Sequence, residues 1–270
     1  MPPRARNMST RTFPSILPAR FGMSKLYNRI IAGYNLKRYK NIWEYPVKTI
    51  ILISASAEWQ AVKPLFPEAE IQMTPFGESM QVALHGRDLA FVHAGWGKIA
   101  SAAALQFVID RYSPDLIVNL GTCGGFSGVV DRGDVILVER TFVYDILELM
   151  DDSDVTPYYA SSLDLGWLAE PHPHPARRGT LASADSDLLP EKIPFLRSKG
   201  AIAADWESAA LAWVANKNHQ RLLILRAVSD LVDADGGEIY GDIEAFKERT
   251  NLIMKQLIEQ LPDWLDAVRL

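Results

Sequence analysis

Three carboxylates in this chain stand where apolar runs end, and together they could perform acid–base chemistry. Glu58, Glu207 and Asp230 each follow, within a few residues, a run that is typical of a buried strand. Ligands of α/β sheets usually bind at the carboxyl ends of the strands, so we expect the three acids near one another. A proton donor on one side of a polar bond and carboxylates on the other would stabilise both charges that develop when the bond breaks.

Each acid also has a purely structural explanation. Glu207 could be a first-turn helix acid favoured by the helix dipole, and Asp230 with Ser229 could cap a helix or form a turn. Glu58 could be a solvated acid at a helix start. Taken together, and with a glycine-rich segment between them in the chain, the three acids favour a functional site.

The glycine-rich segment follows the apolar run at residues 115–118. It reads Val118, Asn119, Leu120, Gly121, Thr122, Cys123, Gly124, Gly125 and Phe126. We interpret it as a turn at a strand end, where the missing Cβ atoms let a ligand touch the main chain. A tight turn with a structural purpose fits the same pattern, so the segment alone does not decide between the two.

Alternating strands and helices are predicted to position these residues. Apolar β-branched runs indicate strands, and apolar residues at helical spacing indicate helices. Strands are predicted at residues 48–54, 80–84, 89–93, 116–120, 134–139, 201–204 and 222–228, and helices at 98–112, 207–217 and 239–261. This alternation predicts one three-layer α/β domain over residues 48–270.

Charge separates a basic N-terminal segment from an acidic remainder. Residues 1–48 hold ten Lys and Arg and one acid, whereas the whole chain of 270 residues has a net charge of −5. The acidic body argues against nucleic acid as a partner, because phosphate neutralisation needs a basic surface. Residues 1–47 are predicted to be an extension, which could be a targeting segment, a flexible tail or the result of a mis-assigned start codon.

Cysteine and histidine usage limits the classes of site. The single cysteine, Cys123, rules out an intrachain disulfide framework and a Cys-rich zinc site. His172 and His174 could bind a metal, but a proline-rich surface loop explains their spacing better, so no metal is expected. The chain lacks a run of about 18 uncharged apolar residues, so we expect no membrane helix and a cytoplasmic protein.

Four motifs, in this order, carry a resemblance to a known family. They are residues 119–125, residues 132–135 (Arg, Gly, Asp, Val), residues 205–210 (Asp, Trp, Glu, Ser, Ala, Ala) and residues 226–230 (Arg, Ala, Val, Ser, Asp). Together they resemble the nucleoside phosphorylase/nucleosidase superfamily, and most of all its methylthioadenosine/S-adenosylhomocysteine nucleosidases. The resemblance covers about residues 47–262. It implies a single α/β domain around a central mixed sheet, assembly as a homodimer or higher homo-oligomer, and no cofactor.

The resemblance also implies roles for individual residues. Asp230 would be the general acid that protonates purine N7, and Glu207 would hold the ribose hydroxyls. Glu58 would be the general base or the orienter of the attacking water, which Arg226 and Thr122 would help to position. The remaining substrate-binding residues would be Cys123, Gly124, Asp185, Leu188, Trp206 and Ser229.

Two further functions remain open beside hydrolysis of a purine nucleoside. Phosphorylases of the superfamily typically carry an arginine where this chain has Asn119, and its absence favours hydrolysis. Lys98 and Arg226 could still bind phosphate, so a purine nucleoside phosphorylase is the alternative, and a non-catalytic nucleoside-binding protein is the third possibility. Trp206 stands where the nucleosidases usually have methionine and Asp187 about where they have a purine-stacking phenylalanine, which leaves the base and the 5′ substituent open.

Overall fold

The computed structural model describes residues 48–150 and 154–269, and the basic segment 1–47 lies outside them. The strands are β1 (Thr49–Ile53), β2 (Ile71–Met73), β3 (Glu78–Leu84), β4 (Arg87–His93), β5 (Leu116–Phe126), β6 (Val135–Val143), β7 (Ala160–Ser162), β8 (Arg177–Ser183), β9 (Ala201–Asp205), β10 (Leu222–Asp233) and β11 (Gly236–Gly237). The helices are α2 (Ser56–Val62), α3 (Gly97–Tyr112), α4 (Ile193–Ser198), α5 (Ser208–Lys217) and α6 (Ile243–Asp266), with short 3-10 turns η2 (Lys63–Leu65), η3 (Thr156–Tyr159) and η4 (Pro190–Lys192).

The strands form one mixed sheet, part of which closes on itself. The first half of β5 pairs in parallel with β1, and β4, β3 and β2 continue the sheet from there. Near its end β5 pairs instead with β9, through Gly124 and Gly125. Because β9 leads through β8 and β6 to β10, and β10 returns to β5, these five strands form a closed ring. The predicted α/β domain around a mixed sheet is confirmed.

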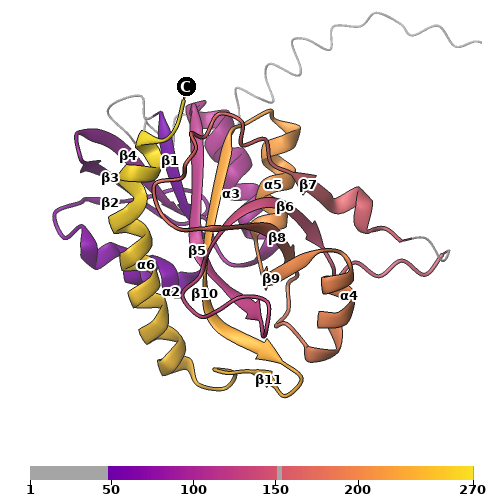
Figure 1. Cartoon of the computed structure of the whole chain (residues 1–270). Helices are drawn as coiled ribbons and strands as arrows, with labels where there is room; N and C mark the ends of the chain where they lie inside the picture. Colours follow the sequence, from indigo (N-terminus) through magenta and orange to yellow (C-terminus); the bar gives the residue numbers. More distant parts are fainter. Residues whose placement is uncertain (1–47, 151–153, 270) are drawn as a thin grey trace, which may run out of the picture. The chain divides into compact units, whose positions relative to one another are not determined.

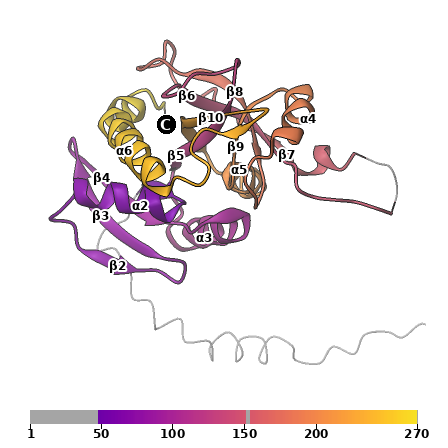
Figure 2. The same ribbon diagram turned by 90° about the horizontal axis from the view of Figure 1, so that it is seen from below.

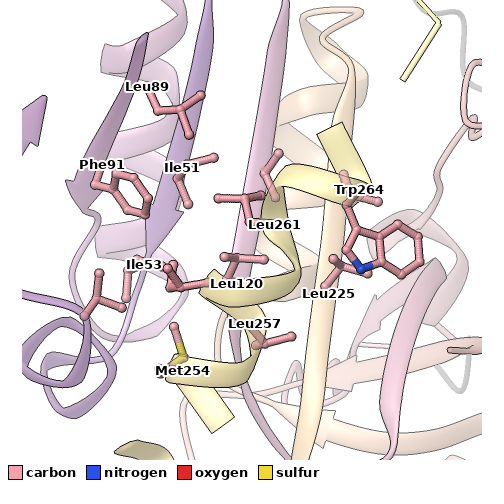
Figure 3. Close-up of a cluster of buried hydrophobic side chains, with 14 of the residues drawn as sticks. Ile51, Ile53, Leu89, Phe91, Leu120, Leu225, Met254, Leu257, Leu261 and Trp264 are labelled. Carbon is pink, nitrogen blue, oxygen red and sulfur yellow. The ribbon is translucent and has the colours of Figure 1, made fainter. Parts of the chain in front are cut away.

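Helices cover both faces of the sheet, so its central strands are buried on both sides. α2 and α6 lie over one face, and α3 and α5 lie over the other (Figure 1, Figure 2). Alternate residues of β1 point into the two cores, since Ile51 and Ile53 pack in the core with α6 whereas Ile50 and Leu52 pack in the core with α3. Figure 3 shows the first core, where Trp264 enters from α6. The sheet interior is therefore apolar, and polar side chains gather at the strand ends.

The glycine-rich segment is a strand, and its prediction as a turn was wrong. β5 continues to Phe126 and pairs with β10 from Ile117 onward. Packing demands glycine here, because a Cβ on Gly125 would lie 2.6 Å from a methyl carbon of Val130 and 2.7 Å from one of Val228. The same pairing continues β10 to Val232, beyond its predicted end at residue 228, and Asp233 then pairs with Gly236 of β11.

Most other elements lie close to their predicted positions. The helices predicted at 98–112 and 207–217 begin within one residue of α3 and α5 and end where these helices end. The last helix begins at Ile243 instead of residue 239, because Asp242 caps it by accepting a hydrogen bond from the Ala245 amide at 3.0 Å. The short elements α2, α4, β2, β7 and β11 were not predicted.

Candidate active site

A cavity of about 590 Å³ opens where β1, β5, β9 and β10 end, a size that suits a small-molecule ligand. The loop after β8 and the segment between β11 and α6 close its other side. Its lining consists of Ala55, Ser56, Ala57, Glu58, Trp96, Thr122, Cys123, Gly124, Asp187, Leu188, Ala204, Asp205, Trp206, Glu207, Arg226, Ser229, Asp230, Ile239, Tyr240, Gly241, Asp242, Ile243 and Phe246.

Arg226 is the centre of a buried charge network at the floor of this cavity. Its side chain is 1% exposed, and its nitrogens lie 3.1 Å from an Asp205 oxygen, 3.4 Å from Glu207 and 3.6 Å from Glu58. It also donates to the Thr122 carbonyl at 3.2 Å. Burial alone would lower the pKa of Arg226, but the three carboxylates raise it above its usual value. The guanidinium therefore stays charged and holds the acids in fixed positions.

Glu58 reaches the network from the first turn of α2. One of its oxygens accepts from the Thr122 amide at 2.6 Å and from the Thr122 hydroxyl at 3.0 Å, and the other accepts from the Ala55 amide at 3.2 Å. Gly121 has to be glycine, because a Cβ there would lie 2.2 Å from a terminal nitrogen of Arg226 and 2.7 Å from Glu58 Oε1. The glycine of β5 thus makes room for the acid and the guanidinium.

Glu207 follows β9 and precedes α5. Its Oε1 accepts from the Gly97 amide at 3.0 Å, so the loop before α3 is fastened to the site. Burial raises the pKa of Glu207, and the neighbouring charges of Asp205 and Glu58 raise it further against the opposing effect of Arg226. Glu207 is therefore able to exchange a proton nearer to neutral pH than an exposed glutamate.

Asp230 also lines the cavity, but among the described residues Arg226 pairs with Glu58, Asp205 and Glu207 and not with Asp230. Its Oδ1 accepts from the Ser229 hydroxyl at 2.7 Å, and that hydroxyl also lies 3.3 Å from the Cys123 carbonyl. Burial raises the pKa of Asp230, which favours the protonated acid, although the Ser229 hydrogen bond opposes this. Two acids with different surroundings in one cavity are a typical arrangement for acid–base catalysis.

Comparison with known proteins identifies the family. Residues 49–261 match the model of a family described as the phosphorylase superfamily. The chain belongs to the phosphorylase superfamily.

Relatives of this superfamily member include two enzymes named 5′-methylthioadenosine/S-adenosylhomocysteine nucleosidase. The one from Bacillus cytotoxicus is 24% identical over 229 residues, which cover 79% of this chain and 99% of the relative. The one from Staphylococcus saprophyticus is 26% identical over 198 residues, covering 66% and 82%. The crystal structure of the MTA/SAH nucleosidase from Streptococcus pneumoniae with 8-aminoadenine has a TM-score of 0.67 at 19% identity and covers 82% of this chain and all of that one. The family resemblance seen in the sequence is confirmed.

In this superfamily member most predicted site residues meet at the cavity, and Asp185 is the exception. The cavity brings together Glu58, Thr122, Cys123, Gly124, Leu188, Trp206, Glu207, Arg226, Ser229 and Asp230. Asp185 does not line it, because its carboxylate accepts from the Lys98 amide at 2.8 Å and pairs with the Lys98 ammonium at 3.2 Å. Lys98 forms ion pairs with both Asp145 and Asp185, and it also lies outside the cavity lining.

The sequence prediction missed several residues of the site. Asp205 had no predicted role, yet it accepts hydrogen bonds from Ser183 at 2.5 Å and from the Ser208 amide at 3.2 Å in addition to its pair with Arg226. Its place at a strand end beside Glu207 was the available signal. Trp96 was also missed, and its ring packs against Trp206 with centroids 4.7 Å apart and the ring planes tilted by 35°.

Three other predicted features lie away from the cavity. The Asn119 side chain is buried and donates a hydrogen bond to the Leu52 carbonyl at 3.0 Å, so it links β5 to β1 within the sheet. His174 lies 2.8 Å from an Asp263 oxygen and His172 packs on Trp264. Within residues 48–150 and 154–269 no group of three potential metal ligands occurs, and none of the helices there could span a membrane.

Proposed function

We propose that this protein hydrolyses the N-glycosidic bond of a purine nucleoside, preferentially an adenosine with a 5′ substituent such as methylthioadenosine or S-adenosylhomocysteine. The observation that carries the proposal is the division of one cavity into two parts. Asp230 lies apart from the contacts of Arg226, while Glu58 and Glu207 are held by that arginine. The names of the related nucleosidases support the choice of substrate.

Asp230 is assigned to the base end of the substrate. Breaking the glycosidic bond leaves negative charge on the purine, and a proton delivered to N7 turns the base into a neutral leaving group. The buried position of Asp230 raises its pKa and so keeps that proton available. The Ser229 hydroxyl donates a hydrogen bond to Oδ1 of Asp230. No described residue donates to Oδ2, so this oxygen is available to the base.

Glu207 and Glu58 are assigned to the sugar end. Positive charge develops on the ribose as the bond breaks, and nearby carboxylates stabilise it. Glu207 would bind the ribose hydroxyls. Glu58, with the Thr122 hydroxyl 3.0 Å away, would orient the attacking water and take its proton, while Arg226 holds Glu58 in place.

The charge balance supports water rather than phosphate as the nucleophile. Arg226 is the single cationic residue among those that line the cavity, all of which lie within the described part of the chain. It already faces three carboxylates, so a phosphate anion would enter a site whose positive charge is compensated. Phosphorolysis remains the alternative for the test below.

Assembly as a homodimer or higher homo-oligomer and a cytoplasmic location stay predictions. The segment after β6 supports an interface between copies, because Leu147, Leu149 and Met150 expose most of their apolar side chains. Sedimentation equilibrium would test the dimer, and a monomer at micromolar concentration would contradict it.

The function is tested by assaying base release from methylthioadenosine, adenosylhomocysteine, adenosine and inosine, with and without phosphate. We expect release without phosphate, and a loss of at least about 100-fold in kcat in Asp230→Asn, since general acid catalysis supplies that much or more. Asp233→Asn is the matched control, because Asp233 is an exposed acid at the end of β10 outside the cavity. Release that requires phosphate would establish the phosphorylase, and tight binding without turnover would establish a binding protein.

A further inference from the structure

The cavity contains a carboxylate that the proposed mechanism leaves unused. Asp187, in the connection between β8 and η4, lines the cavity, and no residue of the described chain donates a hydrogen bond to its side chain. Its acceptor oxygens are therefore available to a ligand. A carboxylate next to a bound base is a strong selector, because it accepts hydrogen bonds and cannot donate them.

The chain on both sides of Asp187 is held in place. On one side, the Asp185 amide donates to Asp145 at 2.8 Å. On the other side, the Tyr240 hydroxyl donates to the Leu188 carbonyl at 2.9 Å, which ties this loop to the segment before α6. The main chain around Asp187 is therefore already ordered, so little conformational entropy is lost when Asp187 forms a hydrogen bond to a ligand.

Asp187 and Asp230 both line the cavity. Burial is the main cause that raises the pKa of Asp230, and the negative charge of Asp187 is close enough to raise it as well. The two carboxylates act together on Tyr240, whose pKa is raised to about 12 mainly by burial. Asp187 and Asp230 thus both lie close enough to Tyr240, which also lines the cavity, for their charges to act on it.

The chemistry of the purine ring says what this acceptor would meet. In a purine, N7 and the substituent on C6 project from the same edge. In adenine this substituent is an amino group, which donates hydrogen bonds, whereas hypoxanthine and guanine carry an oxygen, which only accepts. An acceptor beside the group that faces N7 favours the first and repels the second.

We infer that Asp187 selects 6-aminopurine nucleosides over 6-oxopurine nucleosides by accepting a hydrogen bond from the amino group on C6. The inference rests on the proposed function for the orientation of the base. Protonation of N7 withdraws electron density from the amino group, so this hydrogen bond strengthens as the bond to the sugar breaks. Asp187 therefore contributes to kcat as well as to KM.

The test compares methylthioadenosine with its 6-oxo counterpart, methylthioinosine, in the wild type, Asp187→Asn, Asp187→Glu and Glu191→Gln. We expect Asp187→Asn to reduce the ratio of the two kcat/KM values about ten-fold, since a hydrogen bond to a charged but partly exposed acceptor has roughly this effect. Asp187→Glu restores the acceptor and should recover part of the ratio. Glu191→Gln removes the same charge from an exposed position in η4 outside the cavity and should leave the ratio unchanged.

A ratio in Asp187→Asn within two-fold of the wild type would overturn the inference, and so would a wild type that prefers the 6-oxo substrate. Binding of free adenine and hypoxanthine, measured by calorimetry in the same variants, gives the comparison without turnover. The two results can be separated. If the wild type released no base from either substrate, but bound free adenine more tightly than hypoxanthine and Asp187→Asn lost this preference, the proposed function would fail and the inference would stand.

Discussion

Replacing Arg226 by methionine should cost stability as well as activity. Methionine fills much of the space of the arginine stem, so the main change is the loss of the charge. Glu58, Asp205 and Glu207 then remain buried, each 4% exposed or less, without their cation. Removing one partner of a buried ion pair typically costs about 3–5 kcal/mol, a large part of the roughly 5–15 kcal/mol that stabilises a domain.

The loss should depend on pH in a defined direction. Burial already raises the folded-state pKa of Glu207 above its ordinary range near 4.5, and the substitution removes the Arg226 charge that opposes this rise. The folded state then binds more protons than the unfolded state, so its stability falls as pH rises above that range. The stability loss caused by Arg226→Met should therefore be larger at pH 8 than at pH 5.

Urea unfolding followed by tryptophan fluorescence measures this at both pH values. Arg132→Met is the control, because Arg132 pairs with Glu238 at the surface, 3.4 Å away, where such pairs contribute about 0–1 kcal/mol. A loss below about 1 kcal/mol in Arg226→Met at pH 8, or an equal loss at both pH values, would refute the electrostatic account of this network.

Three further variants or reagents probe the same region. Burial raises the pKa of Glu207 above 4.5, so the contribution of this residue to stability declines as pH rises. The free energy of unfolding should therefore change less between pH 5 and pH 8 in Glu207→Gln than in the wild type. An equal change in both proteins would contradict this. Gly121→Ala should lose about 1–3 kcal/mol in thermal unfolding, since its Cβ would lie 2.2 Å from Arg226, whereas Gly124→Ala, with 3.4 Å to the nearest atom, should lose less. Cys123 is buried and its pKa is raised, chiefly by burial, so a thiol reagent should label it only after denaturation, and rapid labelling of the native protein would disprove its burial.

The local pattern of apolar residues predicted the elements that have continuous apolar runs or regular helical spacing. β1 and β4 have strong apolar runs, and α3 has helical spacing that ends at Ser113, which adopts a left-handed conformation before Pro114. The pattern failed at β5, where glycine was taken to mark a turn. Strand propensity counts glycine as unfavourable, but Val130 of the loop after β5 and Val228 of β10 lie so close to Gly125 that a side chain would not fit.

The sequence by itself determined the fold class, the family and most of the residues of the cavity, because these depend on the types of residue at strand ends. It assigned Glu58, Glu207, Arg226 and Asp230 to one site before their distances were known. Only the tertiary structure decided that Asp205 joins them, because the contact of Asp205 with Arg226 links strand ends that lie 21 positions apart in the chain. It also decided the protonation tendencies of the acids, since a pKa follows from burial and neighbouring charges that the order of residues does not contain.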